Sequence, residues 1–322
     1  MDQYVGDGTI DLSYVYEPYI DAGRIDRELY GVSLGINAPA VIYNYEILKM
    51  AGLERPDVDW TWDDLVEMAI EIYQKTGVKT VPFFSTSPIF GFENWVRQTG
   101  GSFFSDNGQS LGFSRSELLK EYFQIQLKLL NAGALSNVDR AFGLIKDEKE
   151  PFEMEESWIN FIWSNEFVNI KKKEGLPLEL FLLPRIENSK RPGIYLKPSM
   201  FFSITAGSGN ERECAEFINF FIHNQQSNKI LMGDRGVPIV ETVREAMRET
   251  IDEDLKKVFN YIALVRDGNF SPIDPPDPPE ADQVKNLFKK ITISVLKEEI
   301  SPEKGADDFI RQANLILSNK GF

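Results

Sequence analysis

Two short clusters of residues place an aromatic ring beside small polar groups. One cluster, at residues 163–166, reads Trp-Ser-Asn-Glu, and the other, at residues 195–200, reads Tyr-Leu-Lys-Pro-Ser-Met. An aromatic ring can cover the apolar face of a ligand while amides and hydroxyls pair with its polar edge. The clusters therefore suit a ligand with apolar faces and hydroxyl edges, as sugars have, and they predict a binder and not a catalyst.

Residues for bond breaking are scarce. A Ser-His-Asp or Cys-His site would have to use the single histidine, His223, which falls at the polar end of an expected helix. The single cysteine, Cys214, lies on the apolar stripe of that helix, where we expect a buried, inert thiol. No HExxH, CxxC, P-loop or GxGxxG pattern occurs, so no cofactor and no His or Cys metal site is predicted. An all-oxygen calcium site is left open, without a recognisable loop.

Acidic pairs keep one enzymatic alternative open, because a glycosidase needs two carboxylates that face each other across a sugar. Neighbouring acids occur at Asp63 and Asp64, at Glu153, Glu155 and Glu156, and at residues 252–254. With 50 acidic residues in the chain, such pairs arise freely. No pair is therefore singled out as catalytic.

The formal net charge of −15 over 322 residues disfavours DNA, RNA and anionic membranes as partners, since these need clustered Lys and Arg. The basic runs at 171–173 and 289–290 are short and fit solvated helix surface. No apolar run approaches the ~20 residues of a membrane helix. The first residues also lack a signal peptide, so either the protein is intracellular or the chain begins after its targeting segment.

Strands alternate with a larger number of helices, which predicts an α/β fold. Extended segments are expected within 29–44, 78–85, 180–183 and 199–206. Helices are expected at 45–51, 60–75, 93–99, 116–132, 211–224, 227–234, 241–248, 254–265, 281–298 and 302–318.

Local signals mark several boundaries of these elements. Thr61 with Asp64 predicts a helix N-cap, Ser114 or Ser116 is expected to cap the helix from 116, and Ser301 is expected to cap the last helix. The Asn-Gly pair at 107–108 indicates a hairpin turn. Five prolines within 272–279 predict an extended loop or hinge crossing.

The tryptophans divide into structural and ligand-contacting candidates. Trp60 and Trp62 flank a helix start, where a Trp usually packs under the cap. Trp95 has polar neighbours in the sequence, and a position in the core and a contact with the ligand are equally consistent with them. Trp158 and Trp163 are interleaved with asparagines, which a purely apolar core stripe would rarely contain.

Several stretches, taken in their order and spacing, resemble a known family. They are residues 30–38, 43–44, 51–53, 60–65, 98–101, 163–166, 197–200, 215–221 and 235–238. Together they are similar to the extracellular solute-binding proteins of bacterial ABC importers, in the carbohydrate-binding group that includes maltose-binding proteins. The resemblance implies a monomer without cofactor that binds an oligosaccharide and presents it to permease subunits in the membrane.

The resemblance also implies a two-lobed periplasmic-binding-protein-like α/β fold, with hinge crossings and the sugar held between the lobes. Residues 1–36 and 205–270 would belong to the N-terminal lobe, and residues 37–204 and 271–322 to the C-terminal lobe. Compared with the family, the signal segment and the first strands and helices are missing. The N-terminal lobe is therefore expected to be incomplete, with exposed apolar strand edges. The full-length form is expected outside the cell, as a lipoprotein or in a periplasm.

The ligand-binding residues that the resemblance implies are Asn37, Ala38, Trp95, Arg97, Trp163, Ser164, Asn165, Lys197, Ser199, Met200 and Arg235. Trp163 would stack on a pyranose face, and the asparagine and serine side chains would pair with hydroxyls. Lys197 or Arg235 could accept a uronate, which adds acidic oligosaccharides to the expected ligands.

Three alternatives stay open. The protein could be a glycoside-cleaving enzyme that uses two of its carboxylates. It could be a sugar sensor that presents its closed state to a membrane receptor. It could also be a fragment that does not bind, because part of one wall of the site is missing.

Overall fold

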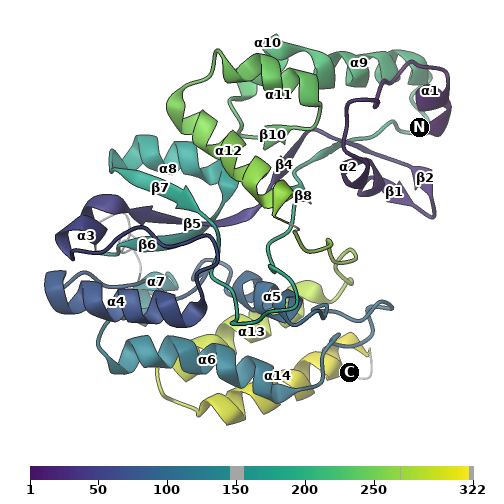
Figure 1. Ribbon diagram of the computed structural model, residues 1–322. Coiled ribbons are helices and arrows are strands. Elements are labelled where there is room, and N and C mark those ends of the chain that lie inside the picture. The colour runs from purple at the N-terminus through teal and green to yellow at the C-terminus, as the bar shows by residue number, and fades with distance from the viewer. Residues whose placement is uncertain (146–155, 269, 319–322) are drawn as a thin grey trace. The chain divides into compact units, whose positions relative to one another are not determined.

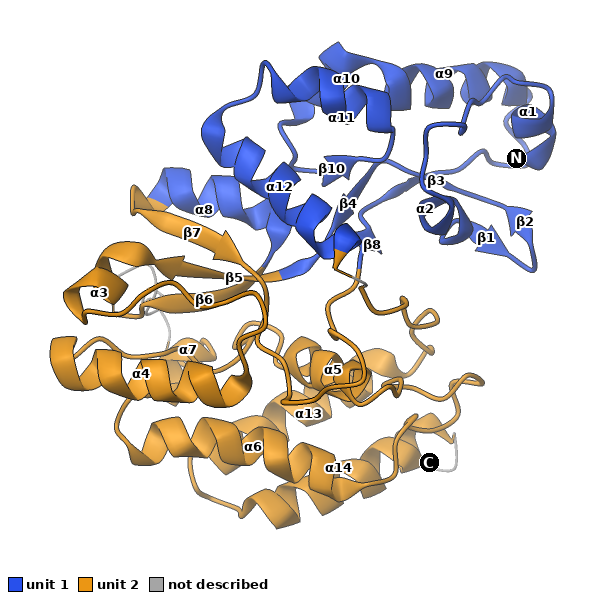
Figure 2. Ribbon diagram, viewed as in Figure 1, with its two compact units in different colours: residues 1–39, 163–173, 196–267 blue, residues 40–162, 174–195, 268–322 orange. Residues whose placement is uncertain are grey.

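The chain folds into two compact units, seen in a computed structural model that describes residues 1–145, 156–268 and 270–318. The first unit contains residues 1–39, 163–173 and 196–267 (Figure 2). The second unit contains residues 40–162, 174–195 and 268–322. Each unit is thus assembled from separate stretches of sequence. Glu153 and Glu155, named above among the acidic pairs, lie outside the described residues.

The first unit combines short strands with helices (Figure 1). Its strands are β1 (Arg24–Ile25), β2 (Glu28–Leu29), β3 (Val32–Ser33), β4 (Gly35–Asn37), β8 (Lys197–Pro198), β9 (Phe201–Phe202) and β10 (Val237–Pro238). Its helices are α1 (Asp2–Gly6), α2 (Glu17–Asp21), the 3-10 turn η2 (Ser164–Glu166), α8 (Phe167–Glu174), α9 (Glu211–His223), α10 (Gln225–Leu231), α11 (Glu241–Arg248) and α12 (Glu253–Asp267).

Strand β4 is the centre of a three-stranded sheet in the order β10-β4-β8. Both neighbours run antiparallel to it, with Val237 opposite Ile36 on one side and Lys197 opposite Asn37 on the other. Gly35 permits this arrangement, because a Cβ there would lie 2.2 Å from the carbonyl oxygen of Arg235. The sheet therefore joins three segments that are distant in sequence.

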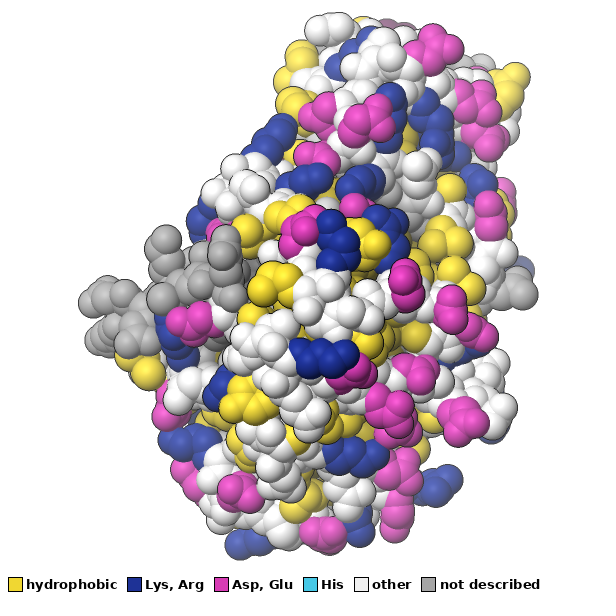
Figure 3. Space-filling view, turned by 60° about the vertical axis from the view of Figure 1, so that its left-hand side comes forward, with side chains coloured by type: hydrophobic (Ala, Val, Ile, Leu, Met, Phe, Trp, Pro, Cys, Tyr) yellow, Lys and Arg dark blue, Asp and Glu magenta, His cyan; other side chains and the backbone are white. Residues whose placement is uncertain are grey.

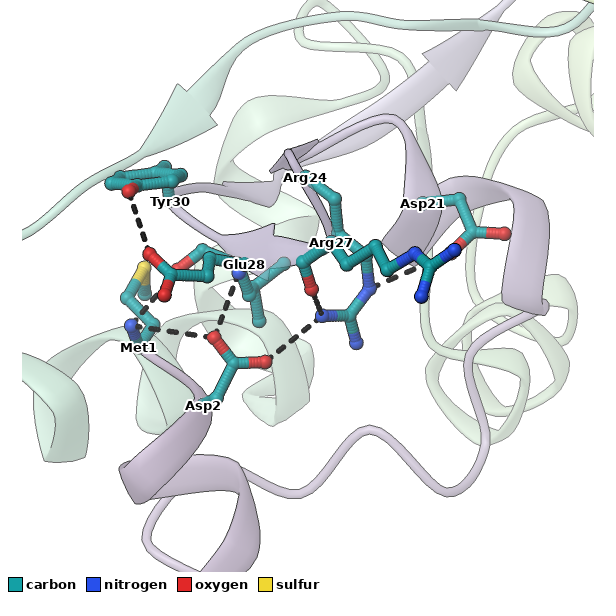
Figure 4. Close-up of polar contacts among 8 residues, drawn as sticks. Met1, Asp2, Asp21, Arg24, Arg27, Glu28 and Tyr30 are labelled. Atoms are coloured by element: carbon teal, nitrogen blue, oxygen red, sulfur yellow. Dashed lines mark hydrogen bonds and ion pairs between the residues drawn. The ribbon is translucent and has the colours of Figure 1, made fainter.

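The first residues are held against the β1–β2 hairpin by a polar network (Figure 4). The amino group of Met1 donates to the carbonyl oxygen of Leu29 at 2.8 Å. The carboxylate of Asp2 accepts from the Leu29 N–H at 2.8 Å and from Arg24 Nη1 at 2.9 Å. These bonds lower the pKa of Asp2, since each of them favours the charged carboxylate.

The second unit packs helices against a three-stranded sheet in the order β6-β5-β7 (Figure 1). Its strands are β5 (Pro39–Asn44), β6 (Ile159–Trp163) and β7 (Leu178–Phe181). Its helices are α3 (Tyr45–Met50), α4 (Trp62–Thr76), α5 (Ile89–Gln98), α6 (Ser116–Asn131), α7 (Val138–Ala141), α13 (Ala281–Leu296) and α14 (Pro302–Leu317). Every residue of β5 is buried, as expected for the central strand of a covered sheet.

Aromatic side chains fill the core of the second unit. The rings of Phe92 and Phe288 stack with centroids 5.5 Å apart, and those of Trp62 and Phe83 are 4.9 Å apart. Trp158 is fully buried and donates its indole N–H to Thr80 Oγ1 at 2.8 Å. Trp60 and Trp62 are also buried, so the structural role predicted for this pair is confirmed.

Most predicted helices are present, and the main errors concern strands. The segment 78–85 makes only isolated parallel bridges at Lys79 and Thr80 and forms no strand of its own. The strand expected over 199–206 is limited to β9, and helix α5 begins at Ile89 instead of residue 93. For the two strands, pairing with residues distant in sequence determines the boundary, and α5 begins directly after Pro88.

The helix caps show which local signals are reliable. Thr61 and Asp64 form the predicted capping box, and Ser301 accepts from the Lys304 N–H at 3.2 Å as the predicted N-cap. The prediction for α6 is wrong, because its N-cap is Arg115 and no side chain caps it. Cys214 is half-buried and not fully buried, since its stripe lies at the edge of the packed face of α9.

The compact units overlap with the predicted lobes but divide the chain differently. Residues 163–173 and 196–204 fall in the first unit, although the lobe boundaries predicted from sequence assign them to the other part. Pairing of β8 with β4 and of β9 with β3 accounts for residues 197–202. The assignment of lobes itself stays a prediction.

The surface carries charges of both signs. Lys and Arg side chains are interspersed with Asp and Glu over the visible face (Figure 3). Some apolar side chains of the first unit are also exposed, among them Phe201 of β9 and Phe217 and Phe220 of α9. Across the described ranges, no helix is long and apolar enough to cross a membrane.

Candidate ligand site on the first unit

One face of the β4–β8 pair gathers three predicted ligand residues. Asn37 lies opposite Lys197 in the ladder, and the N–H of Ser199 donates to the carbonyl oxygen of Gly35 at 2.8 Å. Side chains of directly opposed residues, and of residues two apart on one strand, point to the same face of a sheet. Asn37, Lys197 and Ser199 therefore share a face, and Ile36 and Pro198 point to the other.

Trp163 extends this face. Its indole ring lies below the ammonium group of Lys197, with Nζ 5.1 Å from the ring centroid, which is within cation–π range. The N–H of Trp163 donates to Glu166 Oε2 at 2.7 Å, so the η2 turn fixes the backbone that carries the ring. The ring is half-exposed, which leaves apolar surface available beside a positive charge.

Ser164 and Ala38 have a structural part in this site. Ser164 is buried, its N–H donates to the carbonyl oxygen of Ala38 at 3.0 Å, and its hydroxyl accepts the Ala38 N–H at 3.1 Å. These two bonds join the end of β4 to the start of η2. Direct ligand contact by either residue stays a prediction, whereas their role in positioning Asn37 and Trp163 follows from the bonds.

A turn at residues 234–236 borders the same face. Asn165 Nδ2 donates to the carbonyl oxygen of Asp234 at 3.4 Å, and Arg235 Nη1 pairs with the Asp234 carboxylate at 3.0 Å. Gly236 has a φ of +85°, and a Cβ there would lie 2.9 Å from Asn37 Oδ1. Only glycine therefore lets the turn approach Asn37 so closely.

Two acceptors on this face have no hydrogen-bond partner among the described residues. They are Asn37 Oδ1 and Ser199 Oγ, and both atoms are buried. A buried polar atom without a partner costs free energy of about 1–3 kcal/mol. Hydroxyl groups of a ligand would remove that cost, so these two oxygens favour a polyhydroxylated ligand. Met200, the next residue after Ser199, is exposed.

The structure places Trp95 and Arg97 in the interior of the second unit. Trp95 is 3% exposed and lines a cavity of about 250 Å³, together with Trp62 and residues from α6. Arg97 is 4% exposed, and its Nη2 pairs with Asp274 Oδ2 at 2.6 Å. Direct ligand contact by these two residues stays a prediction, and the observed contacts of Arg97 are internal.

Arg97 is the centre of a buried charged cluster that was not predicted from the sequence. Its Nη2 is 3.7 Å from Glu93 Oε2, and its guanidinium lies 4.2 Å from the Tyr195 ring centroid. Burial raises the pKa of Glu93 to about 7, and the charge of Arg97 only partly opposes this. The i,i+4 spacing of Glu93 and Arg97 was a visible signal, but nothing local indicated that Asp274 of the proline-rich segment would join them.

The single histidine and the acidic side chains are the groups that could take part in catalysis or hold a metal ion. Within those residues, no group of three or more His, Cys, Asp or Glu side chains could hold a metal ion. His223 lies in the last turn of α9, where its Nε2 is 2.9 Å from the carbonyl oxygen of Asp11.

Matches to known sequences include a family model and a curated relative. The family model described as bacterial extracellular solute-binding protein matches residues 3–257. An arabinooligosaccharide-binding protein of Halalkalibacterium halodurans is 36% identical over 85 residues. That match covers 26% of this chain and only 18% of the relative's length.

Solved structures show similarity over nearly the whole chain. An extracellular solute-binding protein of family 1 from Alicyclobacillus acidocaldarius has a TM-score of 0.84 at 26% identity, covering 99% of this chain and 82% of that one. A periplasmic oligogalacturonide-binding protein from Yersinia enterocolitica, in complex with saturated digalacturonic acid, has a TM-score of 0.78 at 18% identity, covering 97% and 78%. At 18% identity the second likeness shows the fold alone.

Proposed function

The chain belongs to the bacterial extracellular solute-binding proteins, and from this membership we propose that it binds an oligosaccharide for delivery to an ABC importer. The proposed binding surface is the face of β4 and β8 that carries Asn37, Lys197 and Ser199, together with the ring of Trp163. Asn165, Met200 and Arg235 border this surface, and Ser164 and Ala38 hold it in place.

One observation carries the proposal. An exposed part of an indole ring lies beside two buried oxygens, Asn37 Oδ1 and Ser199 Oγ, that lack partners among the described residues. An indole ring covers the apolar face of a sugar, and such oxygens accept hydrogen bonds from its hydroxyls. A purely apolar ligand would leave both oxygens unpaired, and that would weaken its binding.

The proposed ligand class is supported by the relatives. An arabinooligosaccharide-binding protein is 36% identical to this chain over 85 residues, and an oligogalacturonide-binding protein shares its fold. Lys197 adds positive charge at the proposed surface, which suits a uronate carboxylate, whereas the charge of Arg235 is paired with Asp234. Acidic oligosaccharides are therefore included in the proposal beside neutral ones.

We further propose that the protein acts as a monomer, without catalysis, outside the cytoplasmic membrane. Family membership supports a location outside that membrane. Attachment as a lipoprotein and transfer of the sugar to permease subunits complete the proposed role. The binding role also predicts that a bound sugar leaves the protein chemically unchanged.

The test compares binding by the wild type with two variants of Trp163. Trp163→Ala removes the stacking ring and should weaken binding of the best oligosaccharide by about tenfold or more, or ~1.4 kcal/mol. Trp163→Phe keeps a ring and should retain most of the affinity. Titration calorimetry measures both variants.

Tyr14→Ala is the matched control, because Tyr14 is an exposed aromatic residue of the same unit. It should bind as the wild type does. Equal affinity of the wild type and Trp163→Ala for the sugar would remove Trp163 from the site.

A further inference from the structure

A small cavity in the first unit brings arginines together. Its walls come from α2, β4, β10, α11 and α12, and its volume is about 140 Å³. Tyr19, Arg244, Arg248 and Arg266 line it. Three guanidinium groups around one cavity are unexpected in a chain with a net charge of −15.

The cavity is separate from the proposed sugar surface. Ile36 lines the cavity, and Asn37, the next residue of β4, belongs to the sugar surface. Successive side chains of a strand point to opposite faces of the sheet. A ligand in the cavity would therefore occupy the other face of the β10-β4-β8 sheet.

Arg244 is fixed with part of its hydrogen-bonding capacity unused. Its Nη1 donates to the carbonyl oxygens of Pro238 at 2.8 Å and Ile239 at 2.7 Å. In the described chain its other N–H groups have no protein acceptor. Burial lowers the pKa of Arg244, and the nearby Tyr19 and Glu241 only partly oppose this. An anion bound beside Arg244 would favour its charged form and so oppose the effect of burial.

Tyr19 adds a neutral donor to the cavity wall. Its side chain is 4% exposed, and its hydroxyl makes no hydrogen bond to any residue that the structure describes. Burial raises the pKa of Tyr19 to about 12, so the hydroxyl keeps its proton at neutral pH. It can therefore donate to an acceptor inside the cavity.

The carboxylates near the cavity do not cancel its positive charge. Glu241 and Glu245 line it but are exposed to solvent. Arg266 is 2.9 Å from Asp267 through Nε, whereas its Nη1 is 4.0 Å from Glu241. The lining thus contains three arginines and two solvated glutamates.

We propose that this cavity binds a small oxyanion, either a phosphate or a carboxylate group, between Arg244, Arg266 and the Tyr19 hydroxyl. Guanidinium groups bind both through paired, charge-assisted hydrogen bonds. Because one water occupies roughly 30 Å³, the cavity has the volume of a few waters and suits a group of this size. This proposal does not depend on the sugar-binding role.

The experiment measures the thermal unfolding midpoint of the complete chain with sodium phosphate, sodium acetate or sodium chloride at equal ionic strength. A bound anion raises the midpoint because it binds only the folded state. Phosphate, acetate or both should exceed chloride, and their order identifies the preferred oxyanion. Titration of the more effective salt then gives an apparent dissociation constant.

Two variants locate the effect. Arg266→Gln should raise that dissociation constant by about tenfold, and Tyr19→Phe should raise it by a smaller factor because only one donor is lost. Arg212→Gln, an exposed arginine paired with Asp7, is the control and should change nothing. Arg244 is left intact because it also holds backbone carbonyls.

Equal midpoints in all three salts would overturn the proposal, as would unchanged phosphate and acetate effects in both cavity variants. The two proposals can fail separately. Arg266→Gln and Tyr19→Phe should leave oligosaccharide affinity unaltered, and Trp163→Ala should leave the oxyanion effect unaltered.

Discussion

Lys197 is the residue that we propose distinguishes an acidic from a neutral ligand. Its ammonium group lies over the Trp163 ring, 5.1 Å from the ring centroid. Lys197→Met keeps much of the apolar stem but removes the charge. Calorimetry should show affinity for an oligogalacturonide falling by about tenfold, with a much smaller change for a neutral oligosaccharide.

Lys172→Met, on the exposed surface of α8, is the charge-matched control. If both sugars lose affinity equally in Lys197→Met, the lysine supports the ring and does not recognise a carboxylate.

Glu93 makes stability depend on pH near neutrality. Its pKa is about 7 in the folded chain and the ordinary value is 4.5. Between these values the unfolded chain binds fewer protons, so this group's contribution to stability is full below about pH 4.5 and is lost as pH rises through 7. The charges around it are Arg97, Asp274, Asp277 and Lys285.

Glu93→Gln removes this titration. The free energy of unfolding of the wild type, minus that of Glu93→Gln, should fall by up to roughly 3 kcal/mol between pH 4.5 and 7. Denaturant unfolding at several pH values measures it, with exposed Glu71→Gln as the control for loss of one charge. A difference that does not vary with pH would show that Glu93 does not titrate in this range.

Helix caps test how far local sequence determines the elements. Thr61→Ala breaks the capping box of α4 and should lower the free energy of unfolding by about 0.5–2 kcal/mol. Ser114→Ala lies just before α6 but removes no cap, so it should change stability by less than about 0.5 kcal/mol. Urea unfolding measures both variants. A larger loss of unfolding free energy in Ser114→Ala than in Thr61→Ala would contradict this assignment of caps.

The sequence predicted those elements whose signals are local. The helical periodicity predicted helices at 60–75 and 302–318 with caps at Thr61 and Ser301. The structure confirms the caps and has the helices at Trp62–Thr76 and Pro302–Leu317. The prediction of a strand at 78–85 failed because pairing there depends on Leu135 and Ser157, which are distant in sequence. Strand boundaries follow from partners that local pattern cannot identify.

The candidate site was predictable in composition but not in its internal contacts. The mixture of Trp163 with amides and hydroxyls is visible in the sequence, and the structure places Asn37, Lys197 and Ser199 on one face. The bond of Ser164 to Ala38 and the burial of Arg97 beside Asp274 depend on segments that meet only after folding. The cavity lined by Arg244, Arg248 and Arg266 was not predicted, because its walls also come from separate segments of the chain.

At the scale of the whole molecule, family membership and the proposed surface agree on reversible binding. A solute-binding protein must release its ligand unchanged, so affinity has to come from non-covalent contacts such as stacking and hydrogen bonds. The half-exposed indole ring of Trp163 and the buried oxygens of Asn37 and Ser199 provide both kinds of contact. The glycosidase alternative requires instead that the sugar be cleaved.

The most direct test is a calorimetric titration with arabino-, galacturono- and malto-oligosaccharides, followed by chromatography of the recovered sugar. We predict saturable binding of at least one of these oligosaccharides, about tenfold or more weaker in Trp163→Ala, with the sugar recovered intact. Cleavage of the sugar, or no binding of any oligosaccharide by the wild type, would contradict the account.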